Sequence, residues 1–190
     1  MKQLDTLLKE HLKYPESKNL QQRGIADKIE DECNRIIITN LAGSTEPRSR
    51  RSIEDVNIML DGKPAYVDHK TSDEALNFKM PNMISIARLK TLDRPLIYSF
   101  VIYNSKQKSI IKTFTLNVYE LNWDYLKIQN LGKGQLQITN MKEFLTNPKT
   151  TLTKQQWLTT FQQEAVKFYK KVQLDAAKRE KEFMQWNPTA

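Results

Sequence analysis

The sequence contains little cysteine and glycine, and it has no long apolar run. Cys33 is the one cysteine among 190 residues, which excludes an internal disulfide and a cysteine-rich zinc site. The two histidines, His11 and His69, lie too far apart in sequence to predict a histidine-based zinc site. A transmembrane helix needs about 20 consecutive apolar residues, and the longest apolar segment, around 95–103, is far shorter. We therefore expect a cytoplasmic protein that does not contact a membrane.

Basic residues outnumber acidic ones. The chain has 30 Lys and Arg against 22 Asp and Glu, a formal net charge of +8 and a pI of about 9.4. A positive excess favours polyanionic partners such as nucleic acids, because neutralised phosphates release their condensed counterions. Many basic proteins bind no nucleic acid, so the charge indicates a class of partner and does not identify one.

Apolar periodicity predicts helices at both ends of the chain. Spacings of three and four residues predict one helix over residues 1–13 and a second over 19–38, and residues 74–92 also have a helical pattern, which Pro81 can interrupt. A Thr-x-x-Gln capping box begins a long helix over 153–185. The last part of this helix is polar and charged, so we expect an arm that leaves the core.

Between these helices the apolar residues alternate with period two. The pattern predicts strands over 56–60, 65–70, 95–104, 109–120 and 135–139. Strands flanked by helices predict an α/β (α+β) fold with a mixed central β-sheet and a long C-terminal helix. We expect one domain over residues 1–190, in which the N-terminal helices occupy 1–40 and the sheet region occupies 53–140.

The first two strands are predicted to bring two acidic residues together. An Asp-Gly pair at positions 61 and 62 is a strong signal for a two-residue hairpin turn. In that register Asp55 lies directly opposite Asp68, with Cβ atoms about 5 Å apart. Residues two apart share a face, so Lys70 joins them on that side. A three-residue turn would instead put Asp55 opposite His69.

This arrangement has a chemical interpretation. Two opposed carboxylates repel each other, and a divalent cation such as Mg²⁺, which prefers carboxylate oxygens, removes the conflict. A nearby lysine can then orient or activate a water, or stabilise charge that develops on a phosphate. The alternative interpretation is that Asp55 is an ordinary strand-edge residue and that Asp68-His69-Lys70 is a solvated strand end. The chemical interpretation predicts hydrolysis of a phosphodiester.

The order of these features resembles the PD-(D/E)XK nuclease superfamily, and most of all its type II restriction endonucleases. Asp55 matches the first acidic residue of the motif, and Asp68-His69-Lys70 matches the (D/E)xK triplet. The resemblance implies a restriction-endonuclease-like fold and Mg²⁺ as the cofactor. Its ligands would be Asp55, Asp68 and the backbone carbonyl of His69, while Lys70 would assist the attacking water.

The resemblance also implies a glutamate on the helix that precedes the hairpin. Glu30 and Glu32 both flank the apolar stripe of that helix, and helical geometry does not choose between them. The superfamily's helix pattern favours Glu30, although glutamates at such positions are usually solvated. Glu54 stands where the superfamily usually has proline.

Basic and amide residues outside this site are candidate DNA contacts. A loop before the first strand carries three candidates for binding phosphates, which are Arg48, Arg50 and Arg51. A second segment carries side chains able to read base edges, which are Lys133, Gln135 and Gln137. Each group also has a simpler interpretation, either as an exposed loop or as a polar strand surface.

The predicted function is that of a Mg²⁺-dependent endonuclease that hydrolyses double-stranded DNA, as a sequence-specific type II restriction enzyme does. Because cutting both strands of a palindrome requires two sites, a homodimer follows from the symmetry of the target. Two alternatives remain open. One is a nuclease specific for a DNA structure such as a junction or repair intermediate, and the other is a non-catalytic DNA-binding module with a nuclease-like fold.

Overall fold

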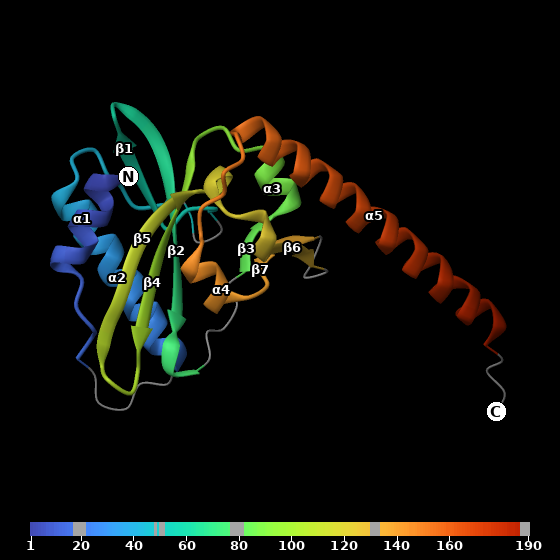
Figure 1. Ribbon diagram of the computed structural model, residues 1–190, viewed down its shortest axis with the longest axis horizontal. Helices are drawn as coiled ribbons and strands as arrows, with labels where there is room; N and C mark the ends of the chain where they lie inside the picture. The colour runs from blue at the N-terminus through green and yellow to red at the C-terminus, as the bar shows by residue number, and fades with distance from the viewer. Residues whose placement is uncertain (17–21, 48, 50–51, 77–81, 130–133, 187–190) are drawn as a thin grey trace.

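The computed structural model describes residues 1–16, 22–47, 49, 52–76, 82–129 and 134–186. Within these ranges it contains a mixed four-stranded sheet, a second three-stranded sheet and five α-helices (Figure 1). The helices are α1 (Lys2–His11), α2 (Gln22–Asn40), α3 (Ile86–Lys90), α4 (Met141–Thr146) and α5 (Lys154–Gln185). The strands are β1 (Val56–Leu60), β2 (Lys63–Asp73), β3 (Asn82–Ser85), β4 (Leu96–Asn104), β5 (Ser109–Asn117), β6 (Leu126–Gln129) and β7 (Gln135–Ile138). Short 3₁₀ turns cover Glu74–Leu76, Val118–Glu120 and Trp123–Tyr125.

The four-stranded sheet has the strand order β1-β2-β4-β5. Strands β2 and β4 pair in parallel, whereas β1 with β2 and β4 with β5 pair antiparallel. All nine residues of β4 are buried, as expected for a central strand that is covered on both faces. The predicted mixed sheet flanked by helices is therefore confirmed. The smaller sheet has the order β3-β7-β6.

Each face of the four-stranded sheet is covered by a different layer (Figure 1). Helices α1 and α2 pack on one face, where Val67, Ile97 and Val101 contribute to a core with the helical leucines and isoleucines. The second sheet, α3, α4 and the start of α5 cover the other face, around Tyr98 and Phe100. The two cores follow from the alternation of side chains along each strand.

Helix α2 has the apolar stripe that its periodicity predicts. The stripe residues are all buried, and they are Ile25, Ile29, Cys33, Ile36 and Ile37. This stripe fixes the rotation of the helix about its axis, because it must face β2 and β1. It therefore determines which of the polar residues on α2 lie closest to the sheet.

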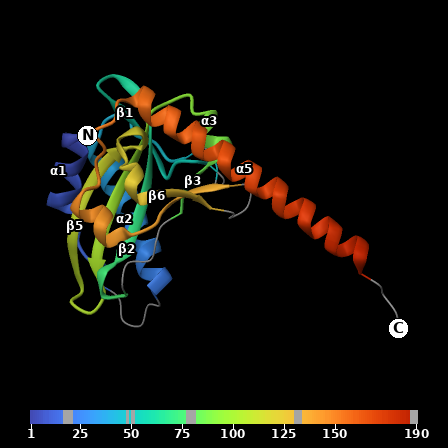
Figure 2. The same ribbon diagram turned by 45° about the vertical axis from the view of Figure 1, so that its right-hand side comes forward.

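Helix α5 begins where the capping box predicts. The side chains of Thr153 and Gln156 cap each other's backbone N–H groups at its first turn. Trp157 and Phe161 are buried in the core, but the helix continues well beyond the body of the molecule. The projection is visible in two views 45° apart (Figures 1 and 2).

One predicted helix is wrong in part. Residues 74–92 were expected to be helical, with an interruption at Pro81, which lies outside the described residues. In the described part of this segment, Glu74–Leu76 forms a short 3₁₀ turn, Asn82–Ser85 forms strand β3 and Ile86–Lys90 forms an α-helix. The side chain of Ser85 accepts a hydrogen bond from the backbone of Arg88 and so begins α3 there. The pairing of β3 with β7 outweighs the local helical pattern.

Across the described ranges, none of the helices combines the length and the apolar composition needed to cross a lipid bilayer.

Candidate functional site

The hairpin turn has the predicted geometry. Asp61 and Gly62 have φ values of 49° and 74°, and a type I′ turn requires positive φ at both central positions. The ladder then runs from Leu60 opposite Lys63 to Val56 opposite Val67. The predicted register of the hairpin is therefore confirmed over the whole of β1.

Asp55 directly precedes β1, at the end of this ladder. Its side chain accepts the next hydrogen bond from β2, in the place of a backbone carbonyl. Its backbone N–H donates to the carbonyl of Val67 over 2.8 Å. Its Oδ2 accepts a 2.7 Å hydrogen bond from the backbone N–H of His69. The carboxyl group thus lies against the edge of β2 that β1 leaves uncovered. The carbonyl of His69 faces this edge too, because both main-chain groups of a strand residue point to the same neighbour.

The carboxyl group of Asp68 contacts Lys70 and lies close enough to Asp55 to be affected by its charge. Its Oδ1 accepts a 2.5 Å hydrogen bond from Lys70 Nζ. Only 11% of the Asp68 side chain and 16% of the Lys70 side chain are exposed. Burial raises the pKa of Asp68 to about 7, the ammonium of Lys70 lowers it, and Asp55 raises it further. Asp68 therefore holds a proton far more tightly than an ordinary aspartate.

Glu30 reaches this cluster from α2. Its Oε1 accepts a 3.1 Å hydrogen bond from Thr71 Oγ1. Burial and the charge of Asp55 raise the pKa of Glu30 to about 7, against the opposing effect of Lys70. Glu32 instead pairs with Arg35 on the exposed side of the helix. Of the two candidates, the structure brings Glu30 to the strand that carries Asp68 and Lys70.

Two further side chains contact residues of β2 at this site, those of Tyr98 and Asn34, and neither is recognisable in the sequence. Tyr98 lies opposite Asp68 in the parallel ladder, and Lys70 Nζ lies 5.7 Å from the centre of its ring. The imidazole of His69 points the other way and contacts Asn34 of α2, with 3.1 Å between Nε2 and Oδ1. Burial lowers the pKa of His69 to about 4, so this link between β2 and α2 is uncharged at neutral pH.

The cluster combines three carboxyl groups, from Glu30, Asp55 and Asp68, with the one ammonium of Lys70. The excess of acidic groups is balanced either by protons or by a bound cation. Carboxylate and carbonyl oxygens are the ligands that Mg²⁺ prefers, so the chemistry of this donor set fits that ion. As the side chains stand, no group of three or more His, Cys, Asp or Glu residues in the described ranges is arranged to hold a metal ion.

The candidate DNA contacts are only partly covered by the structure. Arg48, Arg50, Arg51 and Lys133 lie outside the described residues. Gln135 and Gln137 lie on β7, the middle strand of the second sheet. The amide of Gln137 donates to Asn82 Oδ1 over 3.3 Å. The proposed base contacts of these two glutamines stay a prediction.

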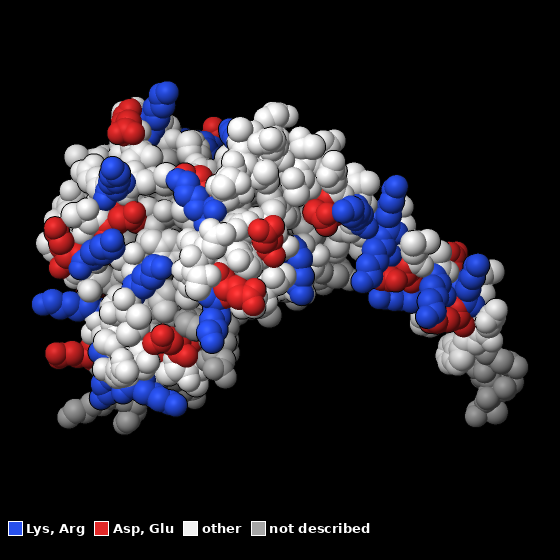
Figure 3. Space-filling model, in the orientation of Figure 1, with Lys and Arg blue, Asp and Glu red and all other residues white. Residues whose placement is uncertain are grey.

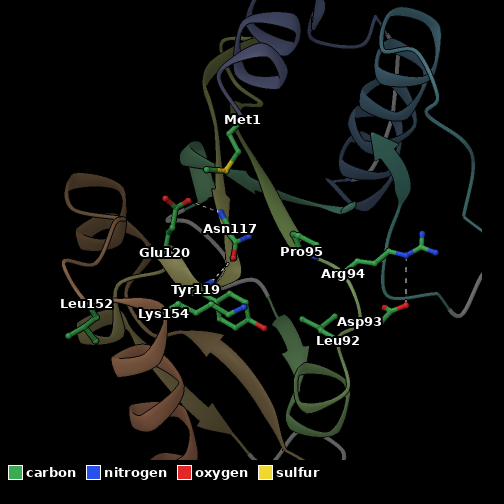
Figure 4. A pocket seen from close by; sticks show the side chains of 10 residues that line it. All are labelled: Met1, Leu92, Asp93, Arg94, Pro95, Asn117, Tyr119, Glu120, Leu152 and Lys154. Atoms are coloured by element: carbon green, nitrogen blue, oxygen red, sulfur yellow. Dashed lines mark hydrogen bonds and ion pairs between the residues drawn. The ribbon is translucent and has the colours of Figure 1, made fainter. Parts of the chain in front are cut away.

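A separate cavity of about 480 Å³ lies between the loop before β4 and the start of α5 (Figure 4). Two cations line it, and each lies over a tyrosine ring: Arg94 is 5.2 Å from the Tyr66 ring centre and Lys154 is 4.6 Å from that of Tyr119. Asp93 and Glu120 also line the cavity. Their charges cancel those of the two cations, so the cavity has no net preference for an anion or a cation.

No protein-family model matches this chain, and no curated protein matches it significantly.

Proposed function

We propose that this protein is a Mg²⁺-dependent endonuclease that hydrolyses phosphodiester bonds in double-stranded DNA. The observation that carries the proposal is the gathering of the Asp55 and Asp68 carboxyl groups beside Lys70 at the uncovered edge of β2, where Asp55 binds the backbone N–H of His69 and Asp68 binds Lys70. A fold under selection for stability alone would avoid burying like charges at one point. Groups with strongly raised pKa values that gather in this way are typical of functional sites.

Asp55, Asp68 and the carbonyl of His69 are the proposed ligands of Mg²⁺, and Glu30 is proposed to complete the site from α2. A bound Mg²⁺ would supply Lewis-acid polarisation of the phosphate group. The proposal is supported by the oxygen-only donor set and by the pKa values of about 7 for Asp68 and Glu30. Both carboxyl groups can release their protons near neutral pH when a cation takes the protons' place.

Lys70 has the proposed role of orienting the attacking water and of stabilising the negative charge that develops on the phosphate. Support for this role comes from its short contact with Asp68 and from the ring of Tyr98 beneath its ammonium group. Attack of water on phosphorus would leave 5′-phosphate and 3′-hydroxyl ends, as the resemblance to PD-(D/E)XK nucleases implies. That resemblance further suggests a sequence-specific type II restriction enzyme, which acts as a homodimer on a palindromic target.

The test is cleavage of plasmid DNA with Mg²⁺ by the wild type, Asp68→Ala and Lys70→Ala. We expect the wild type to give discrete fragments and both variants to lose at least about a hundredfold in rate. Asp61→Asn and Lys63→Ala are matched controls, because both residues are exposed on the same hairpin, and each should cleave like the wild type. Cleavage that survives both site substitutions would refute the assignment of the site.

The same preparation distinguishes the proposed target from the alternatives. Discrete plasmid fragments support a sequence-specific enzyme, whereas cutting restricted to four-way junctions supports a structure-specific nuclease. Tight DNA binding without cleavage, with Mg²⁺ and with Mn²⁺, would indicate a non-catalytic module.

A further inference from the structure

The outer half of α5 has no support from the rest of the molecule. Val172 is the last residue of the helix that is even partly buried, and residues 173–185 are all exposed. This part is about 20 Å long. Most helical stability in proteins comes from tertiary packing, and an isolated helix of this length is marginal in water. The exposed half therefore gains no tertiary packing within the chain, and its surface is open to a partner.

Basic side chains are gathered along this projecting helix, with acidic ones among them (Figure 3). Helical geometry separates the two kinds. At about 100° per residue, one face about 100° wide and about 21 Å long contains five cations and no acid. These residues, which we call the lysine face, are Lys167, Lys170, Lys171, Lys178 and Lys181.

The acidic residues of α5 leave the lysine face largely uncompensated. Lys167 pairs with Glu164 over 2.6 Å and Lys178 with Glu182 over 3.8 Å. These two pairs offset the charges of Lys167 and Lys178. In the described part of the chain, Lys170, Lys171 and Lys181 form no ion pair. The face therefore presents at least three unpaired charges to a partner.

We propose that the lysine face binds the phosphate backbone of a nucleic-acid duplex outside the cleavage site. Duplex DNA carries about one negative charge per 1.7 Å of its axis, so a face about 21 Å long can meet several phosphates. A major groove about 12 Å wide also admits an α-helix. The proposal rests on the proposed function in one respect: the bound duplex is the one that is cut at Asp55 and Asp68.

Two other occupants fit this helix less well. A membrane-bound helix needs a continuous apolar face beside its lysines, but Gln173 and Glu180 interrupt the stripe that runs from Tyr169 to Phe183. Two copies of α5 joined along this stripe would leave the lysine face turned away from the interface, about 160° around the helix, and its charges without a partner. A duplex is the partner whose charge is complementary.

The experiment uses the full chain with Asp68→Ala, so that DNA is bound and not cut. The arm variant Lys170→Gln/Lys171→Gln/Lys181→Gln is compared with Lys2→Gln/Lys9→Gln/Lys13→Gln. The control lysines are exposed at or just beyond α1, on the far side of the sheet from the arm, and the change in charge is the same. Glutamine preserves helix propensity, which far-UV circular dichroism checks.

Duplex affinity is measured by fluorescence anisotropy over a range of NaCl concentrations. The arm variant should bind duplex DNA about tenfold or more weakly. Its plot of log K against log[salt] should be less steep, by about 0.9 for each lost phosphate contact and by up to about 2.7 in total. The control should keep the parent's slope. Equal losses in both variants would overturn the proposal, because net charge alone would then explain binding.

Two other outcomes also overturn it. The arm substitutions could abolish binding to phosphatidylserine vesicles, or change the sedimentation coefficient, without changing duplex affinity; the arm would then serve a membrane or a second copy. The two proposals can fail separately. If the wild type cleaves DNA but the arm variant keeps the salt slope of its parent, the proposed role of the lysine face is refuted and the proposed nuclease function is not. If binding depends on the arm but the wild type never cleaves DNA, the nuclease function alone is refuted.

Discussion

At the scale of single residues, the central feature is a conflict between carboxyl groups that the fold itself creates. Burial and the charge of Asp55 raise the pKa of Asp68 to about 7, against the opposing effect of Lys70. Glu30 adds a third carboxyl group, and Lys70 is the cation that contacts Asp68 directly. Raised pKa values keep protons on these carboxyl groups near neutral pH, and the proposed Mg²⁺ would take the place of those protons.

Stability of the metal-free protein should consequently depend on pH through Asp68. Its pKa of about 7 in the folded state exceeds the value of about 3.9 in an unfolded chain, so the folded state binds more protons between these values. Stability from this group is therefore lost as the pH rises from about 4 to 7. We expect the melting temperature of Asp68→Asn, relative to wild type, to rise by several degrees between pH 5 and pH 8 in EDTA.

The difference between the two proteins isolates Asp68, because the other titrating groups are common to both. His69 acts in the opposite direction: with its pKa lowered to about 4, its contribution is lost as the pH falls below about 6.5. Parallel melting curves for wild type and Asp68→Asn across this range would contradict the raised pKa. Mg²⁺ should raise the wild-type melting temperature more at pH 8 than at pH 5.

The two glutamates of α2 give a second test at this scale. Glu30→Gln keeps an oxygen for the hydrogen bond from Thr71 but removes the charge, so plasmid cleavage should fall at least about tenfold and need more Mg²⁺. Glu32→Gln removes an exposed pair with Arg35 and should leave cleavage unchanged. Initial rates over a Mg²⁺ titration measure both effects. Equal rates for the two variants would remove Glu30 from the site.

At the scale of secondary structure elements, the β1-β2 hairpin sets the position of both aspartates. Gly62 has a φ of 74° and open space where a Cβ would be, so only the backbone conformation constrains it. Gly62→Val should destabilise the protein by about 1–2 kcal/mol, since a β-branched residue disfavours the left-handed region. Gly62→Asn should cost less, because asparagine tolerates that region. Thermal melts compare the two variants, and equal losses would contradict the turn.

The sequence predicts an element well when the residues that determine it lie close together in the chain. The Asp-Gly turn and the alternation of Val56 and Ile58 determine the hairpin register, and a capping box determines the start of α5 at Lys154. Strand β3 is not predictable in this way, because its pairing with β7 joins segments about 50 residues apart. The position of Tyr98 is not predictable from the sequence for the same reason, because Tyr98 is brought to the site by the parallel pairing of β2 with β4.

The residues of the candidate site also divide into those that local sequence predicts and those that depend on contacts between distant segments. Asp55, Asp68 and Lys70 belong to one hairpin, so a single turn predicts their proximity. Choosing Glu30 over Glu32 requires knowing how α2 is rotated against the sheet, and that rotation depends on the packing of the buried stripe as a whole.

At the scale of the whole molecule, the proposed cutting of both DNA strands predicts a homodimer. Sedimentation equilibrium should give about twice the chain mass of 22.3 kDa. A mixed dimer of wild type and Asp68→Ala has one intact site, so it should nick plasmid where the wild type linearises it. Linearisation by the mixed dimer would show that one subunit makes both cuts, and a monomeric wild type that linearises plasmid would contradict the prediction.

The parallel pairing of β2 with β4 also has a consequence for biosynthesis. The ribosome completes helices α1 and α2 and the hairpin that carries Asp55, Asp68 and Lys70 more than 20 residues before Leu96–Asn104 is made. Because β4 is the neighbour of β2 in the sheet and carries Tyr98, the proposed active site stays incomplete until translation has passed β4.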